Sequence, residues 1–210
     1  MKLTKSKKNI TCYICVSKNI ISSYNAKNLS KELNTKFNGK GGGNDTFATV
    51  VLNNTGADKV KAFICTKDLK DEDYINNHYV IMATKKGQVK KTSLEQYPRP
   101  RVNGINAITI KEEDELLEAK LTDGNSQVML ALKSGKAIRF EEAKTRPMGR
   151  NASGVRGIRL QHDRDEVIGM LSVNDMESNI LVVSSNGFGK RSKLEDYRVT
   201  NRGGKGVKTI

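Results

Sequence analysis

The side chains best suited to binding chemistry are cations that recur at one position after each of three glycines. Lys91, Arg139 and Arg191 each stand four residues after such a glycine, and Lys90 and Lys190 stand one residue earlier. Lysine and arginine in register can neutralise successive phosphates of a rod-like polyanion without reading its sequence. We therefore predict that these cations line one rim of a repeated structure. The alternative is a solvated hairpin arm, where lysine is common.

The charge of the whole chain favours a polyanionic partner. The 210 residues include 37 Lys and Arg against 23 Asp and Glu, a net charge of +14. Counterions released from phosphates favour such binding, so nucleic acid is the expected partner, although a basic surface alone has the same composition. No arginine precedes Arg99. Such a shift in composition can mark two segments of different origin, although codon bias and chance also produce it.

The chain lacks the features of a membrane or secreted protein. It has no Trp, and no apolar run approaches the roughly 18–20 residues that a membrane span needs. The charged N-terminus has neither an apolar core nor a cleavage site of the secretory type. We expect a cytoplasmic location and no membrane partner.

Internal repeats at a period near fifty residues predict the fold of the segment 55–210. Turn glycines recur at spacings of 48 and 52 residues, at Gly87, Gly135 and Gly187. A Gly-apolar-x-x-Ile pattern recurs at spacings of 50 and 52 residues and begins at Gly104, Gly154 and Gly206. Three predicted strands begin with an acid, at Asp58, Asp114 and Asp165. Such a period is typical of four-stranded propeller blades. We predict a mainly β fold, a partial β-pinwheel of such blades, with an incomplete ring and exposed strand edges.

The segment 1–54 is expected to form a separate small α+β domain. Residues 10–16 are β-prone, and Leu29, Leu33 and Phe37 have the spacing of an amphipathic helix over residues 28–37. A glycine-rich stretch follows, which we interpret as a loop whose amides could approach a phosphate; it comprises Lys40, Gly41, Gly42 and Gly43. It is not a P-loop, because no Gly-Lys-Ser/Thr follows.

The sequence offers no recognisable catalytic or metal-binding constellation. Cys12 and Cys15 form a C-x-x-C pair without the second ligand pair of a zinc ribbon, so both are expected to be strand residues. His78 and His162 are isolated, and Cys65 is expected at a core strand position. We predict no catalytic residue, no metal and no cofactor in this chain.

Several motifs of residues 55–210 resemble the C-terminal domain of the DNA gyrase A subunit. They are 101–108 (RVNGINAI), 146–149 (RPMG), 153–159 (SGVRGIR) and 186–191 (NGFGKR). The resemblance implies a β-pinwheel that binds and wraps duplex DNA as a module of a type IIA topoisomerase and supports supercoiling. The parent enzyme would be the ATP-dependent complex of gyrase A and B subunits, whose catalytic parts have no counterpart here. Tyr97 and Tyr197, in matching Leu-Glu-x-Tyr contexts, are expected to be packing residues.

The resemblance and the repeated cations together define a predicted DNA-binding set. Its members are Lys90, Lys91, Arg139, Arg150, Arg156, Lys190, Arg191, Arg202 and Lys205. The gyrase signature box is incomplete, because residues 200–206 (TNRGGKG) lack its Gln and lie in a later repeat. The C-terminal domain of the topoisomerase IV A subunit, which lacks the box, is therefore an alternative. A propeller-like scaffold for protein interaction is another.

Residues 9–52 resemble the glycine-rich C-terminal domain of alanyl-tRNA synthetase. The shared order includes residues 16–18 (VSK), 39–43 (GKGGG) and 47–49 (FAT). This resemblance implies a tRNA partner, contacted through Lys40 and Gly41, Gly42 and Gly43. It would make the chain a junction of pieces from two proteins, with the join near residues 53–56.

Overall fold

The computed structural model describes most of the chain and divides it into two compact units. The described residues are 3–6, 9–15, 25–37, 40–45, 47–53, 60–66, 69–97 and 104–209. Unit 1 lies within residues 1–59, and unit 2 comprises residues 60–100 and 104–210. The predicted domain boundary between residues 54 and 55 falls outside the described residues, so it stays a prediction.

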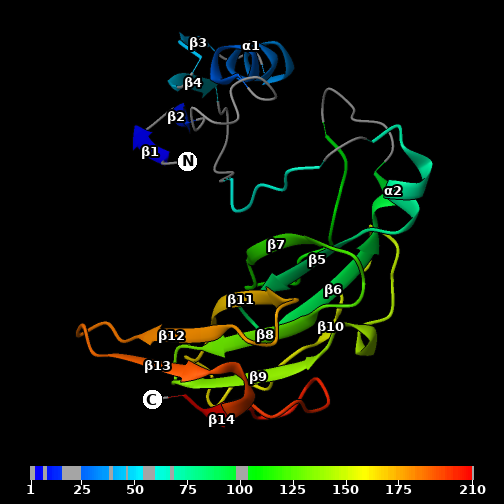
Figure 1. Ribbon diagram of the computed structural model, residues 1–210, viewed down its shortest axis with the longest axis vertical. Helices are drawn as coiled ribbons and strands as arrows, with labels where there is room; N and C mark the ends of the chain where they lie inside the picture. Colours follow the sequence, from blue (N-terminus) through cyan, green and yellow to red (C-terminus); the bar gives the residue numbers. More distant parts are fainter. Residues whose placement is uncertain are drawn as a thin grey trace. The chain divides into compact units, whose positions relative to one another are not determined.

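The described residues of unit 1 form an antiparallel sheet and one helix. Its strands are β1 (Leu3–Ser6), β2 (Asn9–Cys15), β3 (Lys40–Gly43) and β4 (Phe47–Asn53), in the spatial order β1-β2-β4-β3, and its helix is α1 (Ala26–Phe37) (Figure 1). The helix begins where the Asn25 side-chain oxygen accepts a hydrogen bond from the Asn28 amide at 3.1 Å. Ala26 and Ala48 are buried between helix and sheet. The predicted strand, with Cys12 and Cys15 in it, and the predicted helix are confirmed.

The glycine-rich stretch is a strand rather than the predicted loop. Residues 40–43 form the exposed edge strand β3, in which Gly41 pairs with Val50 and Gly42 with Thr49 of β4. Asn34 of α1 also donates its side-chain amide to the Gly41 carbonyl at 2.9 Å. The loop prediction is wrong, because residues 40–43 are extended and pair with β4 instead of forming a turn whose amides converge on a phosphate.

Unit 2 is built on three β-hairpins, after the short helix α2 (Glu72–Asn76). The hairpins are β5 (Tyr79–Thr84) with β6 (Gln88–Ser93), β8 (Gln127–Leu132) with β9 (Lys136–Glu141), and β12 (Asn179–Val183) with β13 (Gly189–Lys193). Gly87, Gly135 and Gly187 turn them at φ values of 83°, 78° and 84°. Only glycine adopts this region readily, so the turn prediction is confirmed. A 3₁₀ turn follows each hairpin, at Leu94–Gln96, Glu142–Lys144 and Leu194–Asp196.

The first two hairpins become four-stranded blades by accepting outer strands from two different places in the chain. In the first blade β7 (Leu116–Thr122) pairs with β5, and β10 (Val155–Arg156), which follows the second hairpin in the chain, pairs with β6. In the second blade β11 (Val167–Val173) pairs with β8, and β14 (Val207–Lys208), which follows the third hairpin, pairs with β9. The sheet orders are β10-β6-β5-β7 and β11-β8-β9-β14. This exchange joins successive blades, and the predicted mainly β fold of four-stranded blades is confirmed.

Apolar side chains fill the space between successive blades. Ile81 and Val89 of the first blade pack against Leu130 and Phe140 of the second. A second cluster joins Met129 of the second blade to Ile180 of the third hairpin and to Leu194 and Tyr197 of the 3₁₀ turn that follows it. Tyr97 packs at the first blade, so both tyrosines are packing residues as predicted. Cys65 is exposed and lies outside any strand, so its predicted core position is wrong.

The acids that lead the repeated strands stabilise the hairpin turns. The Asp165 carboxylate accepts hydrogen bonds from the Ser134 amide at 3.0 Å and the Ser134 hydroxyl at 2.9 Å. In the preceding repeat Asp114 accepts a bond from the Lys86 amide at 2.9 Å. Ser134 and Lys86 both directly precede a turn glycine. The third acid in this register, Asp58, lies outside the described residues.

Candidate nucleic-acid interface

Two of the cations predicted to line a rim are buried between blades. Lys91 and Arg139 are only 4% and 8% exposed. The Lys91 Nζ lies 3.4 Å from the Glu142 Oε1, and Arg139 donates from Nη1 to the carbonyls of Leu194 and Tyr197 at 2.7 and 3.0 Å. The prediction that these two side chains face DNA is wrong, because each charge is used to bind the 3₁₀ turn of the following repeat.

Lys90 is also buried, and its ammonium group binds two backbone carbonyls of the protein. Its Nζ donates hydrogen bonds to the carbonyls of Ala107 and Arg150, both at 2.6 Å. Burial, with a smaller contribution from the Arg150 charge, lowers the pKa of Lys90 to about 8. The predicted contact of this side chain with DNA is therefore wrong as well.

The last hairpin presents its cations to solvent. Lys190 and Arg191 are exposed, although they occupy the same repeat positions as Lys90 and Lys91. Among the described residues no later repeat packs on this hairpin, so neither cation is covered. Both remain predicted DNA contacts.

The four remaining members of the predicted set lie in the two connections that contain β10 and β14. Arg156 and Lys205 are exposed, whereas Arg150 and Arg202 are half-buried. Arg202 donates from Nε to the Lys144 carbonyl at 2.9 Å and from Nη1 to the Arg156 carbonyl at 3.1 Å. The guanidinium thus holds the loop 200–206 against the preceding repeat and brings cations of two repeats together.

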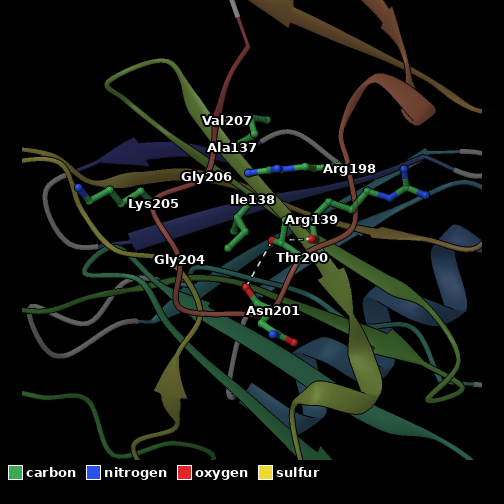
Figure 2. A pocket seen from close by; sticks show the side chains of 10 residues that line it. All are labelled: Ala137, Ile138, Arg139, Arg198, Thr200, Asn201, Gly204, Lys205, Gly206 and Val207. Carbon is green, nitrogen blue, oxygen red and sulfur yellow. Dashed lines mark hydrogen bonds between the residues drawn. The ribbon is translucent and has the colours of Figure 1, made fainter.

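A small pocket lies where this loop crosses the second blade. Figure 2 shows Arg198 and Lys205 on opposite sides of the pocket, which Ile138 and Gly204 also line. The Thr200 amide donates to the Arg139 carbonyl at 2.8 Å and fixes one wall. Two cations from one connection therefore lie beside a hollow that polar residues, apolar residues and two glycines line.

The basic residues of unit 2 are concentrated in the two connections that contain the outer strands β10 and β14. Residues 143–162 and 197–209, which contain the edge strands β10 and β14, carry nine basic residues and no acid; we call these nine the basic edge, and they are Lys144, Arg146, Arg150, Arg156, Arg159, Arg198, Arg202, Lys205 and Lys208. Within the described part of the chain, none of the nine forms an ion pair with an acid.

The opposite edge of each blade is neutralised by ion pairs. Glu115, just before β7, lies 2.8 Å from the Lys61 Nζ and 3.4 Å from the Lys85 Nζ. Glu166, just before β11, lies 3.4 Å from the Lys133 Nζ. Anions are therefore expected to be attracted to the basic edge rather than to this one.

Five members of the basic edge were missed by the sequence reasoning. They are Lys144, Arg146, Arg159, Arg198 and Lys208. A signal was present, because Arg146 and Arg198 are 52 residues apart, as are Gly135 and Gly187. The absence of acids from the two connections was a second signal.

Other kinds of site find no support in the part of the chain that the structure describes. No group of three or more His, Cys, Asp or Glu side chains lies close enough there to hold a metal ion. None of the helices described is long and apolar enough to cross a membrane.

Comparisons with known proteins agree with this architecture. The family profile of the DNA gyrase C-terminal domain, beta-propeller, matches residues 78–123, 128–174 and 178–210. The DNA gyrase A subunit of Staphylococcus epidermidis is 42% identical over 151 residues, which are 71% of this chain and 16% of that protein. The chain thus spans about one sixth of the length of this relative.

Solved structures show the same likeness. The crystal structure of the C-terminal domain of DNA topoisomerase IV superimposes with a TM-score of 0.60 at 29% identity, covering 63% of this chain and 41% of that one. The DNA gyrase A C-terminal domain superimposes with a TM-score of 0.58 at 25% identity, covering 68% and 45%. This chain belongs to the DNA gyrase C-terminal domain family of β-propeller-like modules.

Proposed function

We propose that unit 2 binds and wraps duplex DNA as the C-terminal module of a type IIA topoisomerase. Membership of the DNA gyrase C-terminal domain family supports this function. The observation that carries it is the basic edge, where nine cations lie without an acidic partner among the described residues. Cations so placed can bind phosphates without first breaking an internal ion pair.

The geometry of the basic edge suits a backbone-reading, bending interaction. Arg146 and Arg198, or Arg156 and Lys208, occupy equivalent positions in successive repeats. A duplex that contacts both repeats must follow the turn from one blade to the next, and phosphate contacts along the edge offset the cost of bending. Because side chains that contact phosphates alone carry no sequence information, the interaction is expected to be non-specific.

We propose that the parent protein is the DNA gyrase A subunit, with gyrase A and B subunits as partners and supercoiling as the activity supported. The relative with 42% identity is a gyrase A subunit. The alternative is the topoisomerase IV A subunit, because the topoisomerase IV C-terminal domain superimposes equally well. Chiral wrapping would discriminate the two, because the signature box is a feature of gyrase and the topoisomerase IV A subunit lacks it. In this chain Arg202 of the box-like loop holds two repeats together. A cytoplasmic location stays a prediction.

The tRNA partner predicted for residues 1–54 has no support from the family profile, which begins at residue 78. The stretch Lys40–Gly43, through which tRNA would be contacted, is an exposed edge strand and not the expected loop. Binding of tRNA by unit 1 therefore stays a prediction, to be tested by competition between tRNA and duplex DNA.

The experiment that tests the proposal is ligation of a nicked circular DNA in the presence of increasing protein, followed by deproteinisation and separation of topoisomers. We expect a protein-dependent change in linking number. A triple variant of exposed cations, Arg156→Ala, Arg198→Ala and Lys205→Ala, is expected to abolish it.

The matched control removes three cations from the neutralised edge. Lys61→Ala, Lys85→Ala and Lys133→Ala change the net charge equally but touch lysines that are paired with Glu115 and Glu166. This variant is expected to wrap as the wild type does. Equal losses in both triple variants would show that overall charge, rather than the basic edge, governs binding, and no shift with the wild type would refute wrapping.

A further inference from the structure

Two lysines lie directly opposite each other in the second blade. Lys136 is the first residue of β9, Lys208 is the last residue of β14, and the two are paired across these antiparallel strands. The Cβ atoms of directly paired residues lie about 4.5–5.5 Å apart, and like charges so placed destabilise a sheet. The equivalent pair of the first blade, Gln88 and Arg156, contains one charge only. The second blade therefore brings two cations together where the first does not.

Both lysines belong to the face of the second blade that is turned toward the first blade. Ile138 is part of the apolar cluster between these two blades, and Lys136, two residues earlier in β9, has the same face. Val207 packs in the cluster with the third hairpin, so Lys208, the next residue, has the opposite face. The two ammonium groups therefore lie on one side of the sheet, near the turn of the second hairpin.

Neither lysine is neutralised in the part of the chain that the structure describes. The ion pairs found there all involve other lysines. The Asp165 carboxylate belongs to the same hairpin turn, but it accepts hydrogen bonds from Ser134, Gln161 and Glu166. Its oxygens are thus used by the backbone and by a hydroxyl, and they pair with neither lysine.

Gln161 holds the Lys136 ammonium in place without cancelling its charge. The Gln161 side-chain oxygen accepts a hydrogen bond from the Lys136 Nζ at 2.7 Å. Its side-chain nitrogen donates to the carbonyls of Arg159 and Lys205, each at 3.1 Å. Lys205 lies three residues before Lys208, so the same amide also binds the connection that leads into β14. A neutral side chain thus links the segments that carry the two cations.

We propose that Lys136 and Lys208 bind one phosphate group between them. This inference rests on the proposed function, in which the phosphate is one of the DNA backbone. An ammonium group has three donors, and Lys136 uses one of them on Gln161, so donors of both lysines can reach oxygens of the same phosphate. Such charge-assisted hydrogen bonds replace the repulsion between the lysines by attraction to the anion.

The site adds a residue to the surface already described and makes the two blades unequal. Lys136 belongs neither to the predicted DNA-binding set nor to the basic edge, whereas Lys208 belongs to the basic edge. In the first blade Arg156 lies opposite the neutral Gln88 and has no second cation across the strand pair. A DNA phosphate is therefore expected to be held more tightly at the second blade than at the equivalent position of the first.

Titration of the full chain with inorganic phosphate tests the site without DNA. The NMR signals of the Gln161 side-chain amide are the readout, because this amide is bonded to Lys136. They are expected to shift with phosphate but not with chloride at the same ionic strength. The double variant Lys136→Gln with Lys208→Gln is expected to lose the shift. Equal shifts with both anions would mean that only screening is observed and would overturn the site.

The thermal stability of two single variants tests the repulsion. Lys208→Gln is expected to raise the Tm by about 1–3 °C at low salt, because it separates the like charges. The difference should disappear at high ionic strength. Arg156→Gln is the matched control, since it removes one cation from the equivalent position opposite Gln88 and should leave the Tm unchanged. A Lys208→Gln protein with a lowered Tm would contradict the proposal.

The salt dependence of DNA binding tests whether the two lysines share one phosphate. The double variant Lys136→Gln with Lys208→Gln is expected to reduce the slope of log affinity against log salt by about one. A reduction of about two would assign the lysines to separate phosphates and refute the shared site. The control is Lys85→Gln with Lys133→Gln, whose lysines are paired with Glu115 and Glu166, and it should keep the wild-type slope.

These measurements separate failure of the site from failure of the proposed function. A wild-type chain whose Gln161 signals shift with phosphate but which does not bind duplex DNA would retain the site and refute the proposed function. A chain that binds DNA while the Gln161 signals respond to neither phosphate nor DNA would refute the site and leave the proposed function standing.

Discussion

Replacing Lys91 by Met should destabilise the protein without removing a DNA contact. The Lys91 ammonium is 3.4 Å from the fully buried Glu142 carboxylate and 4.7 Å from the centroid of the Tyr79 ring. Met retains most of the apolar volume but leaves Glu142 buried with only the Thr122 hydroxyl, at 2.7 Å, as a described hydrogen-bond partner. Removing one partner of a buried ion pair costs about 3–5 kcal/mol.

Arg191→Met is the matched control for this prediction. Arg191 has the same repeat position as Lys91 but is exposed. Substitutions at exposed positions usually change the free energy of unfolding by less than about 0.5 kcal/mol. The two variants therefore remove one charge each from equivalent positions, and only one of them is expected to lower stability.

The assay is urea denaturation, followed by thermal unfolding and DNA titration at several salt concentrations. Because about 1 kcal/mol corresponds to roughly 2–4 °C in a domain of this size, Lys91→Met should lower the Tm by about 10 °C. Arg191→Met should instead reduce the slope of log affinity against log salt by about one, if Arg191 contacts a phosphate.

A second substitution separates the ion pair from simple packing. Adding Glu142→Gln to Lys91→Met removes the uncompensated charge and is expected to recover part of the lost stability. A Lys91→Met protein that is as stable as the wild type and has a reduced salt dependence of DNA binding would refute the stabilising role of the Lys91–Glu142 ion pair. That result would favour the original prediction that Lys91 contacts DNA.

Three further predictions concern single residues. The pKa of Lys90 is about 8 in the folded protein and 10.5 in the unfolded chain. Between these pH values the unfolded chain binds more protons, so the free energy of unfolding should rise with pH. Lys90→Met should abolish this rise in urea titrations at several pH values. Burial opposes the charge of Asp165, but hydrogen bonds outweigh it and lower the pKa below 3.8. Asp165→Asn should therefore cost about 1–3 kcal/mol at pH 7, and the difference should shrink in acid below that value. Gly154→Ala should cost more than about 1 kcal/mol in the same assay, because a Cβ would lie 2.6 Å from the Val89 carbonyl; Gly104→Ala, with open space around it, should cost less.

The repeats could be predicted because their landmarks depend on local conformation. A glycine at positive φ is required wherever these hairpins turn, as at Gly135, and the requirement holds for each copy separately. The acid that leads β11 is likewise visible in the sequence, although its bond to the Ser134 amide is not. Local steric rules therefore made the period, the hairpins and the blade-like fold readable from the residues.

The roles of the repeated cations could not be predicted in this way. Lys91 and Arg191 have the same position and similar chemistry, yet one is buried against Glu142 and the other is exposed. The difference lies in what packs on each hairpin, which the residues of that hairpin do not encode. The stretch Lys40–Gly43 shows the same limit, since pairing with β4 overrides the turn preference of its glycines.

The sequence by itself determined that the chain is basic, because charge adds along the chain. Its repeat spacing and turn glycines determined a mainly β chain of repeated blades, because backbone sterics act within a few residues. Only the tertiary structure decided that outer strands are exchanged between blades and that Lys90, Lys91 and Arg139 lie inside. It also decided that, among the described residues, the cations of the connections containing β10 and β14 form no ion pair. Burial and ion pairing depend on segments about fifty residues apart in the chain, and those contacts exist only once the blades have packed.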